Sequence, residues 1–256
     1  MKKTIIKQIV KLGNSSGVVL PKEWEGGTAK VELVKKPLNI REDILKLLRD
    51  YLPSIMGIYL VGSHSRGEQT KDSDVDIIAI SDNLRKDITS GEYNISIYPL
   101  KDVKKTIKQN PLMIYPRILE SKAILNGLLL KDFSRKFNKE SFRGFIADTK
   151  SILRINKEII KLDKDIGEFL SSPQVVYSLI LRLRGLFLVG VLLSNKKYHK
   201  KDFFLKFNKE IGKEDFKKLY AIYEKIKNRE KVDLKIKISI VEQLFSLIKQ
   251  EIRKYD

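Results

Sequence analysis

Two aspartates that follow a Gly-Ser pair are the residues of this chain best suited to chemistry. Gly62 and Ser63 end one apolar run, and Asp74 and Asp76 begin the next after a gap of ten residues. Side chains at i and i+2 of a strand project from the same face, so the two carboxylates point together. Their charges repel unless a cation lies between them, and Mg²⁺ prefers such oxygen ligands. With a glycine that admits a phosphate and a serine hydroxyl that donates to it, the pattern predicts a site for a metal-bound nucleoside triphosphate.

Two strands and the loop between them must position these residues. The apolar run over residues 58–61 predicts the first strand, and the second begins at Asp74 with Val75 and Ile77 turned into a core. A P-loop is excluded because Glu68 and Gln69 stand where that motif needs Lys and Ser or Thr.

The segment resembles the minimal nucleotidyltransferases of the polymerase-beta type, whose signature is Gly-Ser, ten residues, then Asp-x-Asp. The resemblance implies transfer of a nucleoside monophosphate from an NTP to an acceptor hydroxyl on a protein, a small molecule or an RNA end, with release of pyrophosphate. It implies that Asp74 and Asp76 are catalytic and bind Mg²⁺, with Mn²⁺ as the alternative metal and ATP as the expected NTP. The nucleotide-binding residues that match the signature and its flanks are Gly62, Ser63, Arg66 and Ser73.

The family's third carboxylate, on a later strand, has no evident counterpart. The matching strand is expected over residues 93–100, where one face offers Asn94, Ser96 and Tyr98. Glu92 precedes this strand and Asp102 follows it. Three interpretations stay open: the third ligand is missing, Glu92 reaches in from the strand end, or the strand lies elsewhere.

Composition limits the other chemistries. The chain has 256 residues, 42% of them hydrophobic, which supports a folded core. It has no Cys and two His, so a thiolate metal site is excluded and a histidine-based site is disfavoured. The net charge of +19 favours a polyanionic partner, or equally reflects a lysine-rich composition.

Neither export nor membrane insertion is expected. Lys7 and Lys11 interrupt the apolar N-terminus, and the longest apolar stretch, residues 175–193, contains Arg182 and Arg184. A buried helix and a cytoplasmic protein are the better interpretation.

Residues 1–36 form a separate module, with strands expected over residues 4–10, 18–20 and 29–34 and a turn over residues 12–17. Residues 11–17 and 18–22 resemble the swapped-hairpin domain of AbrB and MazE. The resemblance implies an intertwined homodimer and often DNA binding, and dimerisation alone is an equal alternative. The DNA-binding candidates are Lys7, Lys11, Asn14, Ser15 and Lys22.

The whole chain is expected to be α+β: the small β module, a mixed-sheet nucleotidyltransferase domain with flanking helices over residues 37–135, and a helical bundle over residues 136–256. In the second domain a helix is expected over residues 39–51 and a hairpin at Asn126-Gly127. In the third, helices are expected over residues 142–170, 174–193, 201–211, 214–227 and 237–254.

A second function competes with the enzyme. The alternative is a regulator or antitoxin that keeps the nucleotidyltransferase scaffold, has weakened catalysis, and binds DNA through residues 1–36. The absent third carboxylate favours this alternative, whereas the intact Gly-Ser and Asp-x-Asp spacing favours the enzyme. A partner toxin belongs to the regulator hypothesis.

Overall fold

The computed structural model describes residues 4–34, 37–70, 73–233 and 235–255. The chain divides into two compact units, Met1–Asn39 and Ile40–Asp256. The second unit contains both the mixed sheet and the helices that follow it, which confirms the α+β class. The expected division into three domains, with boundaries after residues 36 and 135, stays a prediction.

The first unit contains one antiparallel hairpin, β1 (Ile9–Leu12) and β2 (Ser15–Val18), followed by the 3-10 helix η1 (Lys22–Trp24). Leu12 pairs with Ser15, so the turn is only Gly13-Asn14, and Gly13 has a φ of +58°. The predicted strands over residues 4–10 and 18–20 are therefore misplaced, because the serines taken for a turn belong to β2.

The third strand predicted for the first unit, over residues 29–34, is wrong. Residues 28–33 have no regular structure. None of the described residues of this unit is buried, so a third strand would have no core to pack against within the unit itself.

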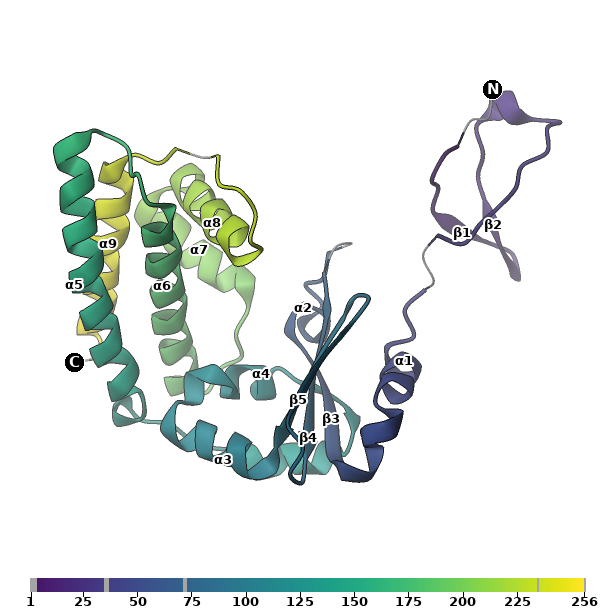
Figure 1. Ribbon diagram of the computed structural model, residues 1–256, viewed down its shortest axis with the longest axis horizontal. Helices are drawn as coiled ribbons and strands as arrows, with labels where there is room; N and C mark the ends of the chain where they lie inside the picture. The colour runs from purple at the N-terminus through teal and green to yellow at the C-terminus, as the bar shows by residue number, and fades with distance from the viewer. Residues whose placement is uncertain (1–3, 35–36, 71–72, 234, 256) are drawn as a thin grey trace. The chain divides into compact units, whose positions relative to one another are not determined.

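The second unit is built on a five-stranded mixed sheet (Figure 1). Its strands are β3 (Ile55–Val61), β4 (Val75–Ser81), β5 (Lys86–Ser90), β6 (Tyr93–Pro99) and β7 (Lys122–Leu125). The strand order is β5-β6-β4-β3-β7, and β4 runs parallel to β6 while the other pairs are antiparallel. The central position of β4 fixes the place of the aspartates at its start.

Both faces of the sheet are covered. On one face α1 (Ile40–Leu47) packs Ile44 against a core that includes Ile58 and Ile77. The other face packs against α3 (Leu100–Gln109), η3 (Pro111–Met113), α4 (Tyr115–Leu119), η4 (Gly127–Phe133) and η5 (Lys139–Phe142). Side chains of a later helix, Val189 among them, join this second core, so the sheet and the helical region share apolar packing.

Three local features differ from the expectations. The helix expected over residues 39–51 ends at Leu47 and is followed by the 3-10 helix η2 (Arg49–Ser54), which contains Pro53. The strand β5 was not expected, because its polar residues at the sheet edge lack a clear alternation. Asn126-Gly127 does not form a hairpin: the Asn126 side chain accepts a hydrogen bond from the Leu129 N–H and begins η4.

The helical region confirms the five expected helices. They are α5 (Arg143–Ile166), α6 (Pro173–Leu193), α7 (Lys200–Ile211), α8 (Lys213–Lys227) and α9 (Ile238–Arg253). Among the described residues, α6 is the helix whose length and composition would let it cross a membrane, and half of its apolar window is buried here. The half-buried Arg184 of α6 donates a hydrogen bond to the Tyr223 hydroxyl of α8. These contacts make α6 a core helix of the unit.

Candidate functional site

The Gly-Ser pair and the aspartates meet because β3 and β4 are antiparallel neighbours. Val61, the last residue of β3, pairs with Asp76, and the short helix α2 (Gly62–Arg66) begins directly after it. Gly62 has a φ of +72°, and a Cβ atom there would lie 2.5 Å from Oδ2 of Asp76. Both the backbone conformation and the close carboxylate therefore require glycine at this position.

The two aspartates lie where the strand pattern predicted. Val75 and Ile77 are fully buried, while Asp74 is exposed just before β4 and Asp76 is half-buried. Burial raises the pKa of the Asp76 carboxyl, and the charge of Asp74 raises it further against the opposing charge of Arg117. The half-buried carboxylate is thus held beside a like charge, which a cation would relieve.

These residues fit a divalent metal ion. Two carboxylates supply the hard oxygen donors that Mg²⁺ and Mn²⁺ prefer, and the missing side chain of Gly62 leaves the Asp76 carboxylate uncovered on that side. Across residues 4–34, 37–70, 73–233 and 235–255, no group of three or more His, Cys, Asp or Glu side chains is arranged to hold a metal. Any metal here would have to complete its coordination with substrate or water oxygens.

The position beside Asp76 on the next strand is an amide. In the parallel register of β4 and β6, Asp76 is opposite Asn94, and the Asn94 Oδ1 accepts a hydrogen bond from Thr89 at 3.3 Å. The strand is where the sequence predicted it, so a misplaced strand does not explain the absent carboxylate. Glu92 lies directly before β6, where its carbonyl accepts the Val75 N–H at 2.7 Å.

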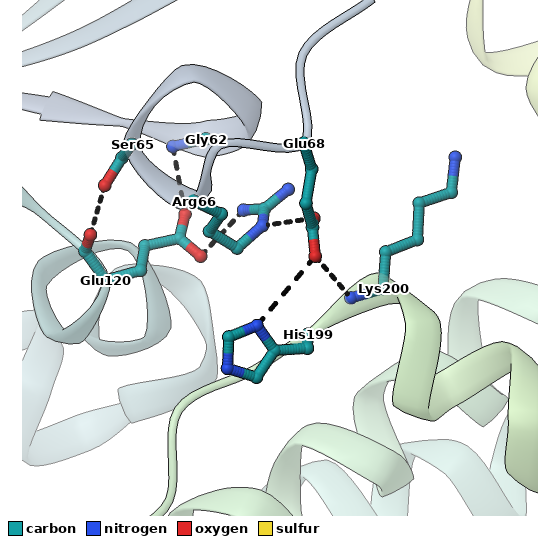
Figure 2. Close-up of polar contacts among 7 residues, drawn as sticks. All are labelled: Gly62, Ser65, Arg66, Glu68, Glu120, His199 and Lys200. Carbon is teal, nitrogen blue, oxygen red and sulfur yellow. Dashed lines mark hydrogen bonds and ion pairs between the residues drawn. The ribbon is translucent and has the colours of Figure 1, made fainter.

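The structure adds one carboxylate that sequence reasoning missed. Glu120, directly after α4, accepts the Gly62 N–H on Oε1 at 3.0 Å and Nη1 of Arg66 on Oε2 at 2.7 Å (Figure 2). Its carbonyl also accepts the Ser65 hydroxyl. The Glu120 side chain is 7% exposed, and burial raises the pKa of its carboxyl despite the opposing Arg66. Glu120 therefore holds both ends of α2, although it lies 58 residues from Gly62 in sequence.

Arg66 is enclosed by ion pairs. Its guanidinium bridges Glu120 and Glu68, each at 2.7 Å, and its side chain is 16% exposed. It also lies over the ring of Tyr198, with 5.5 Å from Cζ to the ring centroid. The predicted role of Arg66 in nucleotide binding stays a prediction, and its charge is already paired within the protein.

Glu68 connects this network to the helical region. Its Oε1 accepts the backbone N–H of Lys200 at 3.2 Å and lies 3.9 Å from Nδ1 of His199 (Figure 2). The segment before α7 is therefore joined to the loop after α2.

The two predicted serines differ in their contacts. Ser73 accepts the Thr70 N–H at 2.8 Å on its hydroxyl oxygen, so it shapes the loop that leads to Asp74. Within the described part of the chain, the half-buried Ser63 hydroxyl makes no hydrogen bond, and Ser63 lies next to Gly62 at the start of α2. Of the two, Ser63 is the serine with donor capacity left for a ligand.

The DNA-binding candidates all lie on the first unit. The side chains of that set are exposed there, and Ser15 donates to the Leu12 carbonyl at 3.1 Å across the hairpin turn. Lys11 is on β1 and Asn14 is in the turn, whereas Lys7 precedes β1 and Lys22 is in η1. Their role in binding DNA stays a prediction.

Comparison with known proteins supports the expected chemistry. Residues 41–144 match the family model of a nucleotidyltransferase domain. The protein adenylyltransferase MntA of Shewanella oneidensis is 43% identical over 49 residues, which are 19% of this chain and 35% of that protein. The chain thus matches about a third of that curated relative's length. The two matches support the prediction of a nucleotidyltransferase enzyme.

Two solved structures are distant neighbours. A nucleotidyltransferase-like protein from Exiguobacterium sibiricum has 12% identity and a TM-score of 0.39, over 84% of this chain and 75% of that one. A toxin-antitoxin structure with AMP-PNP has 20% identity and a TM-score of 0.28, over 46% of this chain and 97% of that one. Both TM-scores are low, so neither likeness contributes to the functional conclusion.

Proposed function

We propose that the protein is a Mg²⁺-dependent nucleotidyltransferase that moves a nucleoside monophosphate from an NTP to an acceptor hydroxyl. The observation that carries the proposal is the packing of Gly62 against Asp76, which joins the Gly-Ser turn to the carboxylate pair. The match of residues 41–144 to the nucleotidyltransferase domain supports the same reaction. ATP is the expected nucleotide, since the curated relative is named as an adenylyltransferase.

In the proposed reaction the acceptor oxygen forms a bond to the α-phosphorus, and the bond from that phosphorus to the departing pyrophosphate breaks. Asp74 and Asp76 would hold the metal, which supplies charge neutralisation for the triphosphate. Ser63 donates its hydroxyl to the phosphates, and Glu120 keeps α2 in position by accepting the Gly62 N–H. With an amide at position 94, the proton of the acceptor hydroxyl passes to water.

Among acceptors we propose a hydroxyl on a protein, following the name of the curated relative. The test is incubation of the full chain with α-labelled ATP, Mg²⁺ and an extract of the source cells, followed by protease and ribonuclease digestion. Label in a protease-sensitive product supports the proposal. Label found only in RNA or in small molecules would show that the acceptor is not a protein. If the chain neither transfers label nor binds ATP, the proposal that it is a nucleotidyltransferase is wrong.

A matched pair of variants separates the site from general effects of charge. Asp74→Asn is expected to abolish labelling because it removes a metal ligand. Asp87→Asn changes the same side chain on the exposed edge strand β5 and should leave labelling at the wild-type level.

The regulator remains a second candidate function because Asn94, not a carboxylate, lies opposite Asp76. It would be a homodimeric cytoplasmic protein that senses nucleotide, binds DNA through residues 1–36 and acts with a partner toxin. A gel-shift titration with the upstream DNA at two salt concentrations tests it. A shift that disappears when residues 1–36 are deleted supports the regulator, and no shift at low salt contradicts it.

A further inference from the structure

A groove of about 350 Å³ runs between α5 and α9, outside the proposed nucleotide site. In Figure 1 these two helices form the side of the second unit turned away from β3 and β4. Leu153 and Ile252, each 4% exposed, lie at its base beside the half-buried ring of Phe245. The remaining lining residues are all cationic: Lys150, Arg154, Lys157, Lys249 and Arg253.

Four of the five cations that line this groove have no acidic partner among the described residues. Within the described residues no acidic side chain lines it. Arg154, Lys157, Lys249 and Arg253 are exposed and form no ion pair with any described residue. By contrast, Lys164 on α5 is paired with Glu242, and Lys254, directly after α9, is paired with Glu251. Arg154 and Lys157 on one rim, and Lys249 and Arg253 on the other, therefore remain available to a ligand.

The spacing of the cations matches an extended ligand. Lys150, Arg154 and Lys157 follow one another at four and three residues along α5, so they line one face of the helix over about 10 Å. Lys249 and Arg253 are four residues apart on α9. Each rim thus presents a row of positive charge with apolar side chains between the two rows.

The apolar base and the cationic rims of the groove together favour one kind of ligand over the others. A phosphodiester backbone would pair with the cations but would leave the apolar base without a matching surface. A second copy of the chain is disfavoured because each copy has a net charge of +19. An amphipathic helix with an apolar stripe between two rows of Asp or Glu satisfies both the base and the rims.

We propose that the groove between α5 and α9 docks an acidic amphipathic helix of a partner protein. Apolar side chains of that helix would cover Phe245, and its carboxylates would pair with the cations of both rims. This interaction is independent of the proposed nucleotide chemistry, because the groove shares no residue with the Gly62–Asp76 site.

The test is fluorescence anisotropy with the full chain and a labelled helical peptide of about 18 residues. The peptide carries leucines at positions i, i+3, i+4 and i+7 and glutamates on both sides of that stripe. A shuffled peptide of the same composition is the control for charge alone. We expect the shuffled peptide to bind at least about tenfold more weakly, since it cannot cover Phe245 and pair with both rims together.

Matched variants locate the binding. Arg154→Glu with Lys249→Glu should weaken peptide binding at least about tenfold, whereas Lys213→Glu with Lys217→Glu, on exposed positions of α8, should change it less than about twofold. Phe245→Ala tests the apolar contact without changing charge. Equal binding of the two peptides, or equal effects of the two double variants, overturns the proposal. Tighter binding of a uridine oligonucleotide that the Arg154 and Lys249 variant abolishes would overturn it in favour of a nucleic-acid surface.

Discussion

The two sides of the candidate site are built differently. On the α2 side, Glu120 accepts the Gly62 N–H and pairs with Arg66, so the buried charges are satisfied within the protein. On the β4 side, Asp76 lies opposite an amide, Asn94, and burial raises the pKa of the Asp76 carboxyl. The buried charges of the α2 side are therefore paired without a ligand, while the carboxylates of the β4 side repel each other and would be relieved by a bound cation. The difference suggests that α2 provides a preformed framework and the aspartates provide the metal-dependent step.

The largest expected effect comes from the β4 side. Asp76→Asn keeps the shape of the side chain but removes a metal ligand, so nucleotide transfer should fall by about 1000-fold, corresponding to about 4 kcal/mol of transition-state stabilisation. Single-turnover transfer from α-labelled ATP measures it, with Asp87→Asn as the control. Wild-type transfer by Asp76→Asn would show that the aspartates are not the reaction centre.

A large effect on stability is expected from the α2 side. Glu120→Ala leaves the Arg66 charge and the Gly62 N–H without their buried acceptor, so the free energy of unfolding should fall by about 3 kcal/mol. Glu140→Ala removes an exposed partner of Arg143 and should cost less than about 1 kcal/mol. Urea denaturation compares the two.

A second variant at position 120 distinguishes the loss of the hydrogen-bond acceptor from the loss of side-chain packing. Glu120→Gln keeps an acceptor for the Gly62 N–H and should recover part of the stability lost in Glu120→Ala. If Glu120→Ala and Glu140→Ala cost the same, the α2 side is not the satisfied network that the structure indicates.

An intermediate effect on kcat is expected when a third carboxylate is added on the β4 side. Asn94→Asp places a carboxylate opposite Asp76 in the register of β4 and β6, and should raise kcat at least about tenfold with Mg²⁺ present. Ser96→Asp adds a carboxylate two residues further along the same face, opposite Ile78, and should not raise it. Equal gains from both variants, or a loss of activity in Asn94→Asp alone, would refute the role assigned to position 94.

The smallest effect is a pH dependence of stability without metal. Because the folded-state pKa of the Asp76 carboxyl is raised above 3.8, the folded protein binds more protons than the unfolded chain between that value and the raised pKa. Stability should therefore fall as pH rises through this window, and less steeply in Asp76→Asn. Thermal unfolding of both proteins across the window measures the difference. A parallel pH dependence in the two proteins would contradict the raised pKa.

The sequence predicted those parts of the site that depend on local pattern. Alternation placed Asp74 and Asp76 on one face, and the apolar runs located β3 and β4. Glu120 was not predictable because its contact with Gly62 depends on where α4 packs, 58 residues away. The hairpin expected at Asn126-Gly127 failed for a related reason: the Asn126 amide donates to the Met56 carbonyl at 2.8 Å, a contact with β3 that no local signal records.

The central claim is that Gly62, Asp74 and Asp76 form one metal-dependent nucleotide site. Titration calorimetry of ATP into the full chain, with Mg²⁺ and then with excess chelator, tests it most directly. The structure predicts binding with Mg²⁺ that weakens at least about 100-fold in chelator, which removes the cation between the carboxylates and the triphosphate. It predicts a similar loss in Asp74→Asn with Asp76→Asn, which removes the carboxylates that would hold that cation. Binding that is equally tight with chelator and in the double variant would contradict the claim.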